Sequence, residues 1–330
     1  MTAYDRKAWQ EIQKWREPSA GRHLLPKPVK RLAASGLRGL GAGATAIPGS
    51  ATVVAAVEGA LGGLLGSVDR VAVASVHRTA IISRFTKQGH AVADLADIRD
   101  LELSDIDKVK PRVDLRYMLA SMGEGAASGA AMTGGYVLAA GGAAAGGVGA
   151  APGISLLVGV TAADAVAVLA ASSRASAEIA AYYGYDVELP HERLYASAVL
   201  GVGLASQAGK AAAYQELNKL VQALARRKTW EVLNKNVMTQ VIKSVYEQFG
   251  VRLTQKKLGQ AVPVVGIVLG AGLNATTLNG VTEAAENIYR ERFLRERYGI
   301  AENVVQGPGR SDEQDVVDVA EILEAELVDP

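Results

Sequence analysis

Two polar residues stand inside apolar parts of this chain, where they could take part in chemistry. Asp164 follows a stretch without Asp, Glu, Lys or Arg that runs from Gly125 to Ala163. A lone carboxylate in such surroundings is costly unless it is paired, so it either fixes helix register or contacts a ligand or ion. Asn274 is the analogous polar residue in a second apolar segment, and its carboxamide could bridge two helices.

A charged face follows Asp164 along the same segment. Arg174, Glu178 and Tyr182 are spaced by four residues, which places them on one side of a helix. This spacing is more typical of a structural network than of a site. If the protein were an enzyme, Asp164, Arg174 and Glu178 would be its leading polar candidates.

The familiar catalytic motifs do not occur. The AGKA sequence at Ala208–Ala211 lacks the rest of a phosphate-binding loop, and GAASG at Gly125–Gly129 has its serine one place too late for a nucleophile elbow. The four histidines lack metal-ligand spacing, and the absence of cysteine removes thiolate chemistry. We therefore predict no catalytic residue, no cofactor-binding residue and no metal site.

The elements that must position these residues are helices. Apolar residues recur at helical spacing and alternation with a period of two is nearly absent, which indicates an all-α fold. The uncharged stretch consists mostly of Gly and Ala, which bury little area but let helix backbones approach closely. We expect a bundle of Gly/Ala-rich helices in which apolar halves join charged halves, so that the body has an apolar end or an apolar centre.

A long apolar helical hairpin is the central expectation. One helix would run to about Gly147, turn at Pro152-Gly153, and continue as a helix from Ile154 to Tyr183. A later helix would begin after Pro263 and end in the polar run ENIYRERFLRERYG.

The N-terminal region has two candidate membrane contacts. Tyr4–Glu17 is predicted to form an amphipathic helix, which either docks on the body or lies at a bilayer surface with Trp9 and Trp15 as anchors. A basic segment follows, whose side chains either meet anionic headgroups or form a solvated flank: Lys27, Lys30, Arg31 and Arg38.

Composition bounds the remaining possibilities. The chain has 330 residues, a net charge of +1 and a mean hydropathy of +0.13. The near-neutral charge gives no reason to expect a nucleic-acid partner. No cleavable signal peptide is visible, and the lack of cysteine fits a cytoplasmic address. We predict a helical domain at 1–300 and an acidic tail at 301–330.

Two stretches carry distinctive patterns of residues. RASAEIAAYYGYD at Arg174–Asp186 is similar to the arginine, Ile-Ala, Tyr-Gly and Asp pattern of the EcsC family. Pro263–Leu294 resembles its Pro-Val-Val-Gly, Gly, Asn and Tyr-Arg pattern. The family takes its name from a bacterial protein encoded beside an ABC transporter linked to protein secretion and processing. The resemblance implies a bacterial, membrane-associated helical protein and supplies no catalytic residues.

Three functions remain open. The first is a non-enzymatic protein that binds a membrane lipid or membrane protein through its Gly/Ala-rich helices. Association would be peripheral or conditional, because Gly-rich segments insert weakly and Asp164 lies within the second apolar segment. The alternatives are an enzyme that acts on a lipid-like substrate and a soluble helical scaffold. The oligomeric state stays open.

Overall fold

The computed structural model describes residues 1–16, 72–117, 150–205, 209–226, 242–247, 249–250 and 265–300. Every regular element in these ranges is helical, which confirms the all-α prediction for this part of the chain. The elements are α1 (Ala3–Arg16), α4 (Arg78–Lys87), the 3-10 helix η1 (Leu95–Asp100), α5 (Leu103–Val109), α7 (Ala150–Tyr182), α8 (Pro190–Leu204), α9 (Lys210–Arg226) and α11 (Val265–Tyr298).

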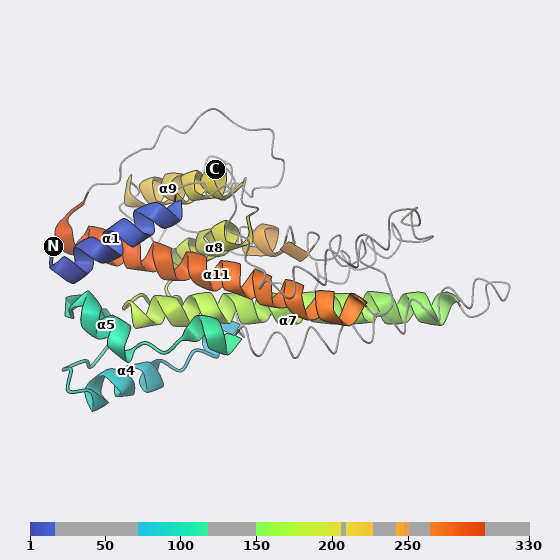
Figure 1. Ribbon diagram of the computed structural model, residues 1–330, viewed down its shortest axis with the longest axis horizontal. Coiled ribbons are helices and arrows are strands. Elements are labelled where there is room, and N and C mark those ends of the chain that lie inside the picture. The colour runs from blue at the N-terminus through green and yellow to red at the C-terminus, as the bar shows by residue number, and fades with distance from the viewer. Residues whose placement is uncertain are drawn as a thin grey trace, which may run out of the picture.

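Two long helices form the axis of the molecule. α7 has 33 residues and α11 has 34, so each is about 50 Å long. They run parallel to each other, because Asn274 contacts Asp164 and, further toward both C-termini, Glu286 contacts Tyr183. Figure 1 shows them side by side, with the smaller helices gathered around their C-terminal portions.

Helix α8 packs antiparallel to α11 across two glycines. A Cβ atom on Gly203 would lie 2.6 Å from the Cα of Val281, and one on Gly280 would lie 2.8 Å from the carbonyl oxygen of Gly203. Both distances are shorter than real Cβ contacts, so the two backbones approach as closely as they do only because side chains are absent. The small residues of the sequence therefore serve close helix packing at this crossing.

A glycine ends α7 and turns the chain toward α8. Gly184 has φ +82°, a left-handed conformation that side chains rarely adopt. A Cβ atom there would also meet the Leu95 carbonyl oxygen at 2.8 Å. Gly184 thus combines a helix-terminating turn with close contact to η1, and it directs Tyr183 and Tyr185 into the core, where both are buried.

Helix α1 docks on the body through one apolar face. Ala8, Ile12 and Trp15 are buried, and the Trp15 ring packs edge-on against Tyr214 of α9. The Trp9 ring lies partly buried in the core. In this conformation both tryptophans contact protein, so they could reach a bilayer only if α1 left the body.

The predicted turn at Pro152-Gly153 is wrong, because α7 already begins at Ala150 and continues through both residues. Proline is tolerated in the first turn of a helix, where its missing N–H has no intrahelical acceptor. The first arm of the predicted hairpin, the basic segment and the acidic tail lie outside the described residues. Among the helices that the structure describes, none has the length and apolar character needed to cross a bilayer.

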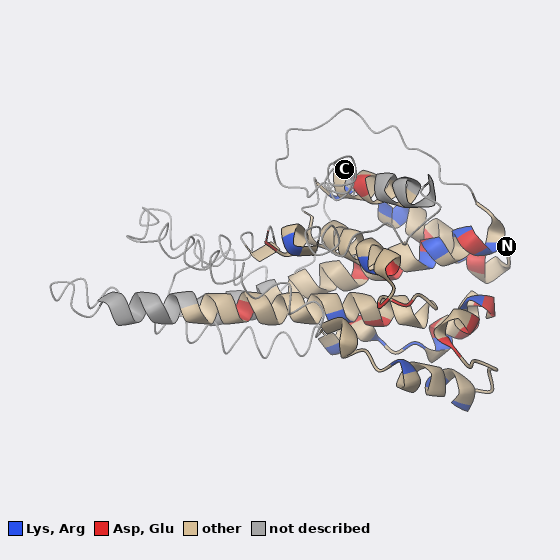
Figure 2. Cartoon of the chain, turned by 180° about the vertical axis from the view of Figure 1, so that it is seen from behind, with Lys and Arg blue, Asp and Glu red and all other residues tan. Residues whose placement is uncertain are grey.

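Charge is unevenly distributed along the three packed helices. α7 carries no charge before Asp164, α11 carries none before Glu283, and α8 carries none after Arg193. Because α7 and α11 run parallel and α8 runs antiparallel, all three helices place their uncharged portions toward the same end. Figure 2 shows Lys, Arg, Asp and Glu gathered around the opposite end, where the N-terminus lies. Among the described helices, the uncharged portions therefore lie toward one end of the body, which agrees with one of the two arrangements expected from sequence.

Candidate functional site

The structure brings Asp164 and Asn274 together where the uncharged portion of α7 ends, beside the uncharged portion of α11. Asn274 on α11 donates a hydrogen bond from Nδ2 to Oδ1 of Asp164 on α7, with a nitrogen–oxygen distance of 2.9 Å. Asp164 is 5% exposed and Asn274 is completely buried. A buried polar group needs a partner, so this bond specifies which residues of the two helices face each other.

A second constellation lies further along α7, where charge begins. The carboxylate of Glu178 accepts hydrogen bonds from Arg116 and from the Tyr117 hydroxyl, the latter at 3.2 Å. Arg174 lies one turn before Glu178 on α7, and Tyr182 lies one turn after it. We call this group the boundary cluster, and it comprises Arg84, Arg116, Tyr117, Arg174, Glu178 and Tyr182.

In the boundary cluster, burial and the carboxylate of Glu178 shift the pKa values of the two tyrosine hydroxyls. Burial and the nearby charge of Glu178 raise the pKa of the Tyr117 hydroxyl to about 12, while Arg174 and Arg116 oppose that rise. Burial also raises the pKa of the Tyr182 hydroxyl, and Arg84 lowers it through its charge and a hydrogen bond. Both hydroxyls are therefore neutral at neutral pH: that of Tyr117 donates to Glu178, and that of Tyr182 accepts from Arg84.

A partly buried ionic network closes the charged end of the molecule. The Tyr183 hydroxyl donates to Oε1 of Glu286 at 2.6 Å, and Lys110 Nζ lies 2.6 Å from the other oxygen of that carboxylate. Arg290 pairs with Asp107 at 2.6 Å. Burial raises the pKa of Tyr183 well above its usual value, and the charge of Glu286 adds to this. The network joins α5, α11 and the end of α7.

Arg292 is held between two aromatic rings. Its guanidinium makes two hydrogen bonds to Glu192, at 2.6 and 2.7 Å, and one to Glu296 at 2.8 Å. The guanidinium carbon lies 4.1 Å from the ring centre of Tyr185 and 4.5 Å from that of Tyr195. Burial opposes the charge of Arg292, but the bonds to Glu192 outweigh it and raise the pKa of the guanidinium. The guanidinium of Arg292 therefore links α11 to α8 through its bonds to Glu192.

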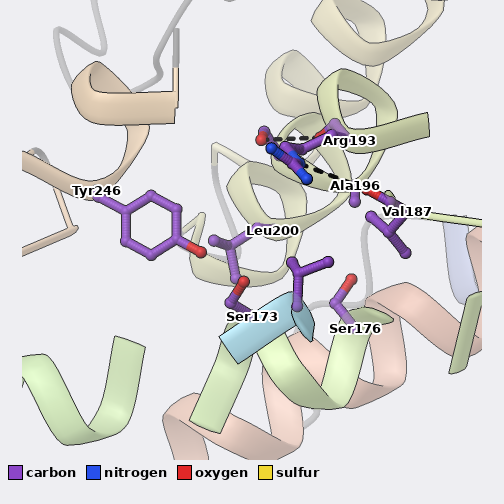
Figure 3. A pocket seen from close by; sticks show the side chains of 9 residues that line it. Ser173, Ser176, Val187, Arg193, Ala196, Leu200 and Tyr246 are labelled. Carbon is purple, nitrogen blue, oxygen red and sulfur yellow. Dashed lines mark hydrogen bonds between the residues drawn. The ribbon is translucent and has the colours of Figure 1, made fainter. Parts of the chain in front are cut away.

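A small cavity lies between α7, α8 and the helical residues 242–247. Ser173 and Ser176 line it from α7, Arg193 from α8, and Tyr246 points its hydroxyl toward Ser173 (Figure 3). Its volume of about 10 Å³ is roughly that needed for one water molecule. This cavity therefore has no room for a substrate, and neither Asp164 nor Glu178 lines it.

The described residues offer little for catalysis. No group of three or more His, Cys, Asp or Glu side chains within the described ranges is arranged to hold a metal ion. Asp164 and Glu178 both lie on α7, but Asp164 bonds to Asn274 and Glu178 to Arg116, so the structure places them in separate constellations. Arg174 belongs to the second of these.

Sequence reasoning missed the partners of Glu178. Arg116 lies 62 residues away from Glu178 in the chain, so no local spacing indicates the pair. One signal was present, because Arg116 is the last basic residue before the uncharged stretch and Arg174 is the first after it. The two flanks of that stretch meet at Glu178.

The fold and these constellations define an all-helical protein organised on two parallel helices with an uncharged end. A family model described as the EcsC protein family matches residues 70–294, and the chain belongs to this family. The chain is also similar to "Uncharacterized protein YdbA" of Bacillus subtilis (strain 168), with 35% identity over 140 residues, 41% of this chain and 47% of the relative. It thus spans about half the length of the curated relative it matches. No solved structure matches.

Proposed function

We propose that this protein associates with membranes through its uncharged end, peripherally or conditionally, and has no catalytic activity. The observation that carries the proposal is that three packed helices place their uncharged portions at the same end of the molecule. The uncharged portions of α7, α8 and α11 all lie toward one end, although α8 runs opposite to the other two. A bilayer rejects charge strongly and accepts small apolar residues at little cost.

The exposed surface of α7 supports the same function. Gly159 and Ala163 are exposed, one turn apart, within the uncharged half of the helix. Nothing lies within 4 Å of a Cβ atom built on Gly159. This face could therefore meet lipid or the apolar surface of a membrane protein without rearrangement of the helices, although Gly and Ala supply little hydrophobic area. Such contacts favour reversible association over stable insertion.

Two alternatives make different predictions. An enzyme acting on a lipid-like substrate would need a cavity beside its polar residues, and the cavity described above holds about one water molecule. A scaffold with no membrane role would use its small residues only for packing, as Gly203 and Gly280 do at the crossing of α8 and α11. The scaffold predicts that the protein does not bind lipid vesicles, with or without changes on the exposed face of α7.

Flotation with vesicles of neutral phosphatidylcholine in high salt tests the proposal. The variant G159E/A163E adds two carboxylates on the exposed face of α7, and we expect it to lose flotation while the unchanged protein floats. Its control is Q10E/Q88E, which adds the same charge at two exposed positions outside the uncharged half. Circular dichroism verifies that both variants are helical. Absence of flotation by the unchanged protein, or equal flotation by both variants, would refute the proposal.

A further inference from the structure

We propose that the boundary cluster binds the phosphate groups of anionic lipid headgroups. The inference rests on the proposed membrane association and deepens it, because it names a lipid class and the side chains that select it. Guanidinium groups match phosphate geometry through paired N–H donors, and a compact group of them is a common anion-binding arrangement.

The first argument is an excess of positive charge. Three arginines of the cluster share one carboxylate, that of Glu178, and only Arg116 forms an ion pair with it. Among the described residues, neither Arg84 nor Arg174 has an ion pair. Four arginines of α11 each pair with a carboxylate: Arg290 with Asp107, Arg292 with Glu192, Arg295 with Glu291 and Arg297 with Glu102.

The second argument is the position of the cluster along α7. Arg174 is the first basic residue of the helix and follows the uncharged half. It lies ten residues beyond Asp164, about 15 Å along the helix axis. If the uncharged end meets the acyl chains, the headgroups lie at the level of the first arginines. Tyrosine side chains are favoured at this level of a bilayer, and the partly buried Tyr117 accompanies the arginines here.

The third argument is access. The Arg116 side chain is 50% exposed, and Arg84 is exposed as well. Arg174 is partly buried, and its Nε has no hydrogen-bond partner within the described part of the structure. A phosphate at the surface would therefore contact Arg84 and Arg116 directly, and the charge of Arg174 would attract it from beneath them.

Binding to vesicles with and without phosphatidylglycerol tests this inference. The variant R84Q/R174Q removes two cluster charges and leaves the Arg116–Glu178 pair intact. Each basic residue near an anionic surface strengthens binding about fivefold, so we expect roughly 30-fold weaker binding to phosphatidylglycerol vesicles in low salt. Binding to pure phosphatidylcholine should not change. The matched control K7Q/K108Q removes the same charge from exposed lysines away from the cluster, and it should bind nearly as the unchanged protein does.

The outcomes separate the two proposals. Absence of binding to phosphatidylcholine refutes the proposed membrane association itself. Binding to phosphatidylcholine together with equal anionic preference in R84Q/R174Q and K7Q/K108Q refutes only the role of the boundary cluster. A further variant, K27Q/K30Q/R31Q/R38Q, tests the basic segment, and if it alone abolishes the anionic preference, the cluster is also excluded.

Discussion

The glycine crossing between α8 and α11 makes a sharp prediction about packing. In G203A, the new Cβ atom would lie 2.6 Å from the Cα of Val281 and 3.2 Å from the carbonyl oxygen of Gly280. Ordinary carbon contacts are about 3.5–4.0 Å, so the helices would have to separate by roughly 1 Å. The closest atom belongs to the backbone, so no side-chain rotation can relieve the contact.

The same helix contains a matched control. Gly201 lies two residues earlier on α8, and a Cβ atom there meets nothing within 4 Å. Replacing a helical glycine by alanine stabilises by about 1 kcal/mol, so G201A should raise the free energy of unfolding by up to that amount. G203A has the same intrinsic gain but carries an overpacking cost of about 1–3 kcal/mol. The two variants should therefore differ by about 1–3 kcal/mol, with G203A the less stable.

Urea denaturation followed by far-ultraviolet circular dichroism measures this difference. Both variants should show the same dependence of free energy on urea concentration, because the surface exposed on unfolding is nearly unchanged. G203A should have the lower midpoint. Equal midpoints, or a higher one for G203A, would show that the two backbones are not in contact at this crossing. The reciprocal variant G280A, whose Cβ would lie 2.8 Å from the Gly203 carbonyl oxygen, should behave as G203A does.

Two further predictions concern the charged end. R292K keeps the charge but loses the paired bonds to Glu192 and the stacking between two rings, so it should lower the free energy of unfolding by about 2 kcal/mol in the same urea assay. Burial raises the pKa of Tyr183 and Tyr289 well above the usual value, so both stay protonated in the folded protein while the unfolded chain ionises near pH 10. The contribution of these tyrosines should be constant below about pH 9, begin to fall above it, and approach a slope of about 1.4 kcal/mol per pH unit for each tyrosine above about pH 10. Urea titrations from pH 8 to 11 should find a shallower fall in Y289F.

The sequence predicted helices where local signals mark both ends. The last long helix was expected after Pro263 and through the polar run that follows, and α11 spans Val265–Tyr298. The N-terminal helix was expected at Tyr4–Glu17 and is observed at Ala3–Arg16. The predicted start of α7 was wrong, because proline is common both in loops between helices and in the first turn of a helix, where Pro152 lies. Local spacing cannot distinguish them.

Contacts between distant residues were harder to foresee. The cost of isolated polar groups singled out Asp164 and Asn274, but nothing in the sequence states that they bond across 110 residues. The pairing depends on the parallel packing of α7 and α11, which is a tertiary property. Glu178 was expected to interact along its own helix face, whereas its ion-pair partner is Arg116. Helical periodicity shows which residues share one face of a helix, but it does not show which residues of other helices contact that face.

The docking of α1 has a consequence for the order of events during synthesis. The Tyr298 hydroxyl donates to Asp5 at 2.5 Å, across 293 residues of chain. At translation rates of about 5–20 residues per second, α1 waits roughly 15–60 s before this part of its docking surface exists. During that interval, α1 lacks its contacts with α11, although α9, whose Tyr214 packs against Trp15, is synthesised earlier. The nascent chain therefore presents an amphipathic helix to chaperones and membranes before the folded protein conceals it.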